Sequence, residues 1–220
     1  MKKIALSLAT VALMFTVVSC NKTQPVETKE EAPVAETPVA AVVYTADAAN
    51  SKIEWKGAKL GGMDAHNGTI AIKSGELSVK DGMIESGSFV IDMNSISVLD
   101  ITDPKKKEML EGHLKGSDEK NADHFFNVAQ FPEGKFEITA VKEGNIEGNL
   151  TLKGETKNIS FPATVTVNDT EVSVVTETFT INRTEWNINY NNEESEIAKT
   201  AKDKVISNNI EIKLDIKAKK

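Results

Sequence analysis

Cysteine and arginine are nearly absent from this chain, which contains one of each, Cys20 and Arg183. A single cysteine cannot form a disulfide within the chain, so no disulfide framework holds the fold together. A basic surplus is also missing, since 26 lysines and arginines face 33 aspartates and glutamates and the formal net charge is −7. Because proteins that bind nucleic acid normally present a basic face, this balance argues against nucleic acid as a partner.

The sequence patterns of common catalytic and cofactor sites are missing as well. There is no Gly-x-Ser-x-Gly elbow, no phosphate-binding glycine loop and no dinucleotide fingerprint. The three histidines, His66, His113 and His124, lie in separate segments without the close spacing of paired metal ligands. We therefore expect a protein that is not an enzyme, with no catalytic residues, no cofactor and no metal ion.

The longest apolar run lies at the N-terminus. Lys2 and Lys3 precede an apolar stretch of about fifteen residues, Ile4 to Val18, that is interrupted only by serine and threonine. Such a run is too short to cross a bilayer comfortably, which takes about twenty apolar residues. The pattern predicts that residues 1–19 are a signal peptide.

The apolar run ends in Val17-Val18-Ser19-Cys20, which resembles the lipobox of bacterial lipoproteins. The resemblance implies that Cys20 receives a diacylglyceryl group, which would also cap a thiol that is exposed to an oxidising compartment. The membrane would then be a partner, and we expect a lipid-anchored protein of the bacterial cell envelope, on its periplasmic or outer-membrane face. The alternative is an ordinary signal peptide that happens to contain a cysteine.

Residues 21–43 are rich in proline, threonine, glutamate, alanine and valine and show no hydrophobic period. A segment of this composition cannot bury a core, and its prolines and glutamates favour extended conformations. We predict that residues 20–43 comprise the lipidated cysteine and a disordered tether. The remaining residues, 44–220, have the size of one domain.

Most of this domain alternates apolar and polar residues with a period of two, the pattern of strands with one dry and one wet face. In the clearest case Ile210, Ile212, Leu214 and Ile216 alternate with Glu211, Lys213, Asp215 and Lys217. Further strands are expected over residues 53–60, 69–74, 76–80, 84–93, 135–142, 146–153, 158–168 and 171–182. Turn residues such as Asp81-Gly82, Glu143-Gly144-Asn145 and Asn168-Asp169 separate neighbouring strands, which favours antiparallel hairpins.

One segment departs from this alternation. A helix is predicted to begin after Asp103, which is followed by proline, and to end near Gly116, with Leu110 and Leu114 on one face. Residues 105–107 of this helix are three lysines, for which a solvated face is favoured over anion binding.

Consecutive antiparallel strands would expose two sheet edges unless the sheet closed on itself. We therefore predict an all-β fold, a single antiparallel barrel of about eight strands with one short helix. A barrel of this size can be filled by its own side chains or can hold one small ligand, and the alternation is compatible with both.

Two further features bear on the interior of the barrel. Four phenylalanines, Phe125, Phe126, Phe131 and Phe136, follow the expected helix closely, and a packed core is their plain interpretation. Arg183 offers five fixed donors, which could bind backbone carbonyls as a structural clamp or the carboxylate of a ligand. We favour the clamp.

Several motifs occur in order along residues 44–220. They are His66-Asn67-Gly68-Thr69-Ile70, Lys73-Ser74-Gly75-Glu76-Leu77, Gly87-Ser88-Phe89-Val90-Ile91-Asp92-Met93, Gly112-His113-Leu114-Lys115, Phe125-Phe126-Asn127-Val128, Phe131-Pro132, Gly148-Asn149-Leu150-Thr151-Leu152-Lys153-Gly154 and Arg183-Thr184-Glu185-Trp186. In this order they resemble the YceI-like family, the polyisoprenoid-binding proteins of the bacterial envelope. One departure is the loop of residues 116–124, which is longer than is usual in the family.

The resemblance implies a lipocalin-like barrel that encloses an apolar channel for an isoprenoid chain. Removal of roughly 25 cal/mol per Å² of apolar area from water would drive binding without catalytic groups. The implied function is non-enzymatic binding, transport or storage of an isoprenoid lipid, either a polyprenyl chain or a quinone-related molecule. The expected wall residues are Phe89, Ile91, Leu110, Phe125, Phe126, Phe136, Leu150, Leu152, Phe161 and Phe179, with Arg183 at the channel end.

Two other functions remain open at this point. One is an enzyme that modifies such a lipid, and the other is a structural or adhesive surface module whose barrel is filled by its own side chains. Besides the lipid and the membrane, a second copy of this chain is the partner that we consider, as a homodimer.

Overall fold

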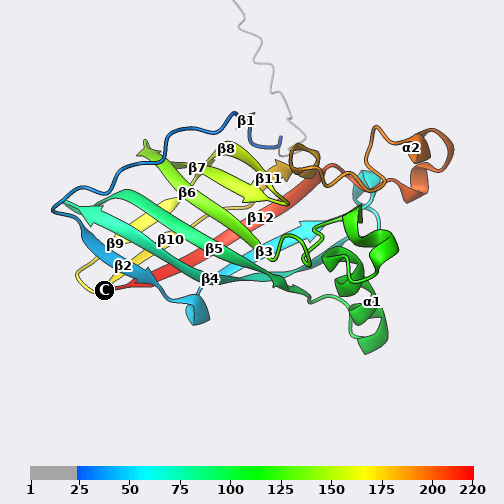
Figure 1. The fold of residues 1–220 in the computed structure, drawn as a ribbon, viewed down its shortest axis with the longest axis horizontal. Helices are drawn as coiled ribbons and strands as arrows, with labels where there is room; N and C mark the ends of the chain where they lie inside the picture. The colour runs from blue at the N-terminus through cyan, green and yellow to red at the C-terminus, as the bar shows by residue number, and fades with distance from the viewer. Residues whose placement is uncertain (1–23) are drawn as a thin grey trace, which may run out of the picture.

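Twelve strands form one antiparallel sheet that closes into a barrel (Figure 1). The structure, a computed structural model, describes residues 24–220. The predicted signal peptide, residues 1–19, and the predicted lipidation site Cys20 lie outside the described residues. The antiparallel barrel is confirmed, and its strand count is larger than the eight that the sequence predicted.

The strands are β1 Thr28–Lys29, β2 Val42–Ala46, β3 Lys52–Gly57, β4 His66–Lys80, β5 Met83–Val98, β6 Glu133–Lys142, β7 Asn145–Leu152, β8 Glu155–Pro162, β9 Thr164–Val167, β10 Glu171–Val175, β11 Phe179–Asn182 and β12 Asn209–Lys219. The α-helices are α1 Pro104–Lys115 and α2 Glu196–Thr200, and the 3-10 helices are η1 Ala48–Asn50, η2 Leu60–Gly62, η3 Glu119–His124, η4 Arg183–Trp186 and η5 Lys202–Lys204. The sheet order is β1-β8-β7-β6-β5-β4-β2-β12-β10-β9. β3 also joins β4 to β12, and β11 pairs with β12. Both α-helices lie at one end of the barrel (Figure 1).

Some strand boundaries differ from the prediction. Residues 69–74 and 76–80 belong to one strand, β4, which continues through Gly75. A Cβ atom on Gly75 would lie 2.4 Å from Cδ1 of Phe89, so glycine is needed there for the ring to pack against the backbone. The predicted strand 158–168 is divided between β8 and β9, and residues 171–182 are divided between β10 and β11. Ala163 and residues 176–178 are the segments that lie outside the strands at these two points.

Helix α1 has the predicted boundaries. The side chain of Asp103 accepts hydrogen bonds from the backbone N–H groups of Lys105 and Lys106, at 3.0 and 3.1 Å. Gly116 ends the helix in the left-handed conformation, with φ of 73°. The prediction of one helix was incomplete, because α2 is a second α-helix of only five residues.

Residues 24–41 lie along the outside of the barrel, and we call them the N-terminal strap. The Val26 N–H donates to the Thr180 carbonyl oxygen (2.7 Å), and the Ala35 N–H donates to that of Ile138 (3.0 Å). Between these points Thr28 and Lys29 pair with β8. The prediction of a disordered tether is therefore wrong for residues 24–43, of which the last two belong to β2. The composition was misleading because the strap binds through its backbone, which requires no hydrophobic period.

The strap fills the seam where the two ends of the sheet meet. Among residues 24–220, no strand pairing joins β8 directly to β11. The strap lies between them, since β1 pairs with β8 and Val26 bonds to Thr180 of β11. On the inner side of the seam the rings of Phe161 and Phe179 stack with centroids 4.7 Å apart. The seam is thus covered by backbone outside and closed by aromatic rings inside.

Asn149 of β7 holds the middle of the strap. Its side chain is completely buried although it points away from the barrel interior. Its Oδ1 accepts from the Ala32 N–H (3.0 Å), and its Nδ2 donates to the Ala32 carbonyl oxygen (2.7 Å). The Asn158 side chain donates to the same Oδ1 (3.0 Å). One amide thus replaces the strand partner that Ala32 lacks.

We expect Asn149→Ala to release the strap. The substitution removes both hydrogen bonds of the Ala32 backbone, and each such bond contributes about 0.5–1.5 kcal/mol. Limited digestion with a glutamate-specific protease should then cleave at Glu30 and Glu31 about tenfold faster than in the unmodified protein. The control is Asn145→Ala, because the Asn145 side chain bonds only to the carbonyl of the neighbouring turn. Equal cleavage rates in the two variants would contradict the assigned role.

Candidate functional site

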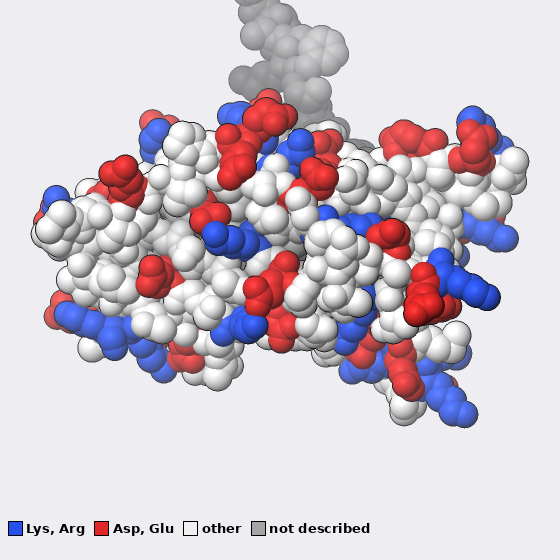
Figure 2. Space-filling view, viewed as in Figure 1, with Lys and Arg blue, Asp and Glu red and all other residues white. Residues whose placement is uncertain are grey.

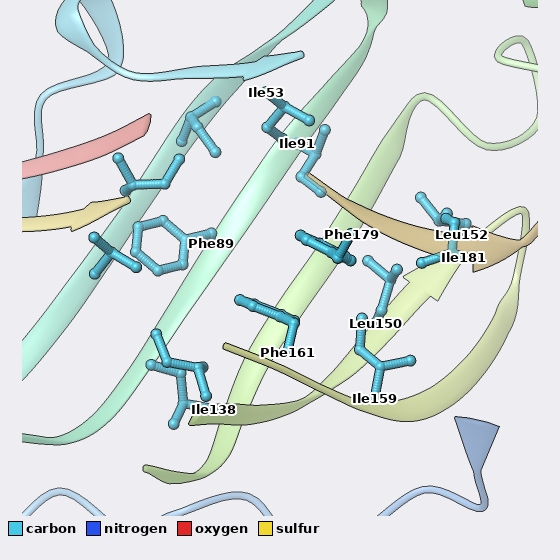
Figure 3. Packing of buried hydrophobic residues seen from close by; sticks show 14 of the residues in the cluster. Ile53, Phe89, Ile91, Ile138, Leu150, Leu152, Ile159, Phe161, Phe179 and Ile181 are labelled. Carbon is cyan, nitrogen blue, oxygen red and sulfur yellow. The ribbon is translucent and has the colours of Figure 1, made fainter. Parts of the chain in front are cut away.

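The barrel encloses an apolar cavity of about 560 Å³. Ligand sites typically measure roughly 300–1,000 Å³, so this volume suits one small molecule. Inward-facing side chains of several strands and of α1 form its walls. Figure 3 shows Phe89 of β5, Phe161 of β8 and Phe179 of β11 pointing into the interior from different strands.

The structure places every predicted wall residue around this cavity. They are Phe89, Ile91, Leu110, Phe125, Phe126, Phe136, Leu150, Leu152, Phe161, Phe179 and Arg183. Their contact with a lipid stays a prediction. Other lining residues were missed, among them Trp55, Ile72, Ile138, Ile159 and Trp186. Strict alternation from Phe136 and Phe161 would have found Ile138 and Ile159, whereas Trp186 lies in a 3-10 helix that has no period-two signal.

Alternation along β7 explains how the wall is made. Leu150 and Leu152 point inward, and Gly148 precedes them on the same face. A Cβ atom on Gly148 would lie 2.2 Å from Cζ of Phe136, so the missing side chain leaves room for that ring. The glycine thereby lets a phenylalanine ring of the neighbouring strand pack against its backbone.

The cavity does not run through the whole barrel. Tyr44, Val79, Ile84 and Val172 are buried at the end remote from the helices and do not line the cavity, so they fill the interior there. The Tyr44 hydroxyl also donates to the Asn168 carbonyl oxygen (2.8 Å). The interior is therefore hollow toward α1 and packed at the opposite end, which excludes a barrel filled throughout by its own side chains.

Apart from the buried Arg183, the charged and imidazole side chains that line the cavity lie where it opens. Lys59, Asp64, His66 and His113 border this mouth and are all at least partly exposed. Lys59 and Asp64 form an ion pair of 2.7 Å. The mouth therefore lies beside α1 and the β3–β4 connection, and a polar head group would meet charged and imidazole side chains there.

Four aromatic side chains gather at one side of the mouth. His113 Nε2 and His124 Nδ1 lie 2.9 Å apart in a hydrogen bond. The His124 ring stacks on Tyr190 with centroids 3.9 Å apart, and Phe125 meets His113 edge-on at 5.1 Å. His124 belongs to the long loop of residues 116–124, so this loop packs behind His113, which lines the cavity.

This cluster should respond to pH. Burial, and then the charge of His124, lower the pKa of His113 below its ordinary value. The unfolded chain binds a proton more readily, so the stabilising contribution is present above about pH 6.5 and is lost as the pH falls below it. We expect the melting temperature to drop more between about pH 7.5 and about pH 5.5 in the unmodified protein than in His113→Gln. Calorimetry measures both melting temperatures, and an equal drop in the two proteins would refute this assignment.

Arg183 is a structural clamp at the inner end of the mouth. Its guanidinium is almost completely buried and donates to four backbone carbonyl oxygens. The distances are 3.0 Å to Ser207, 3.0 Å to Tyr190 and 3.1 Å to Ile206, and Ile188 is the fourth partner. Burial lowers its pKa to about 10, so the group remains charged at neutral pH. The carbonyls occupy four of the five donors, which leaves no pair of free donors for a ligand carboxylate.

Metal sites and membrane-spanning helices are both absent from residues 24–220. No group of three or more histidine, cysteine, aspartate or glutamate side chains is placed to hold a metal ion in this part of the chain. None of its helices is both long enough and apolar enough to cross a bilayer.

The sequence matches a family model described as the YceI-like domain over residues 44–218. Among curated proteins, a UPF0312 protein of Staphylococcus aureus strain N315 is 33% identical over 92 residues, which are 39% of this chain and 50% of that protein. A UPF0312 protein of strain Mu50 matches to the same extent. The chain thus spans about half the length of the curated relatives it matches.

Two solved structures share the fold. BcnA from Burkholderia cenocepacia aligns with a TM-score of 0.54 and 20% identity, over 79% of this chain and 99% of that one. A polyisoprenoid binding domain from Saccharophagus degradans, implicated in plant cell wall breakdown, aligns with a TM-score of 0.54 and 16% identity, over 80% and 97%. At these identities the likeness shows a common fold.

Proposed function

Because this chain belongs to the YceI-like family, we propose that it binds an isoprenoid lipid inside its barrel and carries or stores it in the bacterial cell envelope. The observation that carries the proposal is the cavity of about 560 Å³, whose walls are phenylalanine, isoleucine, leucine and other apolar side chains. A polyprenyl chain or the tail of a quinone-related molecule has the matching chemistry. The Saccharophagus neighbour, a polyisoprenoid binding domain, supports the same ligand class.

Burial of an apolar chain supplies the affinity. Each Å² of apolar surface that leaves water contributes roughly 25 cal/mol, and both the ligand and the cavity walls lose such surface. Because the inner walls offer few directed polar contacts, selection among lipids rests on the width and depth of the cavity. The packed end sets that depth.

The geometry favours binding over catalysis. The titratable groups Lys59, Asp64, His66 and His113 border the mouth, away from the inner wall. Arg183 lies deeper, but its donors are bonded to backbone carbonyls. A buried apolar chain would therefore contact no pair of groups suited to general acid and base catalysis.

The anchor belongs to the same proposal. A diacylglyceryl group on Cys20 would hold the carrier at a membrane, on the periplasmic or outer-membrane face of the envelope, next to the source of its lipid. Mass spectrometry of the N-terminal peptide tests this point. A mature chain that begins at an unmodified residue other than Cys20 would rule out the anchor.

Organic extraction of the natively purified protein tests the ligand. We expect an isoprenoid lipid in an amount comparable to that of the protein, identified by mass spectrometry of the extract. Protein purified after denaturation and refolding is the control and should carry none. An extract without isoprenoids, from protein that was never denatured, would count against the proposal.

A further inference from the structure

Large apolar side chains are exposed around the mouth of the cavity. We call four of them the rim residues, with exposed fractions between 37% and 74%: Leu60, Met63, Leu99 and Met109. Leu60 and Met63 belong to the β3–β4 connection, where the Lys59 N–H donates to the Met63 carbonyl oxygen (2.8 Å). Lys59 itself lines the cavity, so these two side chains stand directly at its opening.

Leu99 belongs to the same rim although it comes from another connection. Its N–H donates to the Asn67 carbonyl oxygen (2.9 Å) at the start of β4. The next residue, Asp100, pairs with His66 at 2.8 Å, and His66 lines the cavity. The β3–β4 and β5–α1 connections are therefore joined side by side at the mouth.

Helix α1 adds the fourth apolar side chain and basic charge. Met109 precedes His113 by one helical turn, so both lie on neighbouring positions of one helix face. Lys105 and Lys106 are exposed on the preceding turn, and neither forms an ion pair within the described part of the chain. Figure 2 shows basic side chains, with acidic ones between them, projecting where α1 lies.

We propose that the mouth docks on the surface of a lipid bilayer, with the rim residues in the interfacial layer and the α1 lysines against anionic head groups. The inference rests on the proposed function, because the occupant of the cavity is an apolar chain. Passage through water would expose that chain again at an unfavourable free energy, whereas direct contact between the mouth and a bilayer avoids this. An exposed apolar patch beside lysines is the composition of surfaces that lie in the membrane interface.

The opposite end of the barrel provides the matched comparison. It also exposes apolar side chains, namely Val39, Val42, Val43 and Met83. The interior there is packed and the cavity does not reach it. Contact of this end with a bilayer would give a lipid no access to the cavity, so we expect it to stay in water.

A single fluorophore at each end tests the docking. Met63→Cys and Met83→Cys, in the full-length protein purified from the membranes of the producing cells, are each labelled with an environment-sensitive nitrobenzoxadiazole group. Both are then placed in vesicles of equal parts phosphatidylcholine and phosphatidylglycerol, with and without a doxyl-labelled lipid. The unmodified protein, taken through the same labelling, reports any reaction at Cys20. The anchor is the same in both variants, so a difference between them reports orientation.

We expect the Met63→Cys probe to shift to shorter wavelength and to lose about half of its fluorescence to the doxyl lipid, since interfacial elements bury their apolar face roughly 5–10 Å deep. The Met83→Cys probe should keep the emission that it has in water. Equal behaviour of the two probes would overturn the docking proposal. Lipid extraction from the same variants separates the two hypotheses. If isoprenoid lipid is present and the Met63→Cys probe stays in water, only the docking proposal is wrong. If the unmodified protein carries no isoprenoid lipid, the proposed function is wrong.

Discussion

Replacement of Arg183 by methionine is expected to lower the free energy of unfolding by about 3–5 kcal/mol, because four buried or partly buried carbonyl oxygens lose their donors at once. The midpoint of urea unfolding should fall accordingly, with little change in its slope. The free energy of unfolding of Arg183→Lys should lie between those of the unmodified protein and Arg183→Met, since an ammonium group keeps the charge but cannot reach all four carbonyls.

The control for this prediction is Lys157→Met, which removes a partly buried lysine whose partner, Glu30, is 3.8 Å away and almost fully exposed. A long ion pair with one fully exposed partner contributes about 0–1 kcal/mol. If Arg183 were a ligand site, Arg183→Met would lose its lipid while keeping its unfolding midpoint. That outcome would replace the clamp by a binding role.

Leu150→Trp is expected to reduce the co-purifying lipid about tenfold or more, because overpacking a well-defined cavity costs typically about 1–3 kcal/mol. Leu150 lines the cavity from β7 and pairs with Phe136 of β6, so a larger ring there occupies space that the lipid would need. Extraction and mass spectrometry, normalised to protein, measure the effect. The melting temperature and the far-ultraviolet spectrum report whether the barrel is intact.

The matched control is Lys135→Trp, which places the same ring on the outer face of the neighbouring strand. Its lipid content should equal that of the unmodified protein. Undiminished lipid in Leu150→Trp, with normal lipid in the control, would remove Leu150 from the binding wall.

Strand alternation made the inward-facing side chains of the strands predictable, whereas the hollow interior was expected from the family resemblance. Side chains two apart on a strand share one face, so one inward residue on each strand fixes the others. Phe89 and Ile91, or Leu150 and Leu152, could therefore be assigned to the interior before any pairing was known. Helix α1 was equally accessible, since its cap residue and its terminal glycine are local signals.

Features that depend on distant partners were out of reach of the sequence. The carbonyls that bind Arg183 come from residues 188–190 and 206–207, and nothing local identifies them. The packed end of the barrel depends on residues from four strands, among them Tyr44 and Val172. The docked conformation of the strap was also not predictable, because its contacts use backbone groups that every residue has, so no side-chain pattern marks them.

The docked strap has a consequence for how far the barrel can travel. With residues 24–41 held against the wall, only residues 21–23 connect it to Cys20. Four peptide units span at most about 14 Å, whereas the undocked chain up to β2 would reach about 75 Å. A lipid on Cys20 would thus limit the barrel to a short distance from the leaflet that holds the lipid. Delivery to a second membrane would then require either peeling the strap from Asn149 or a recipient that comes to the carrier.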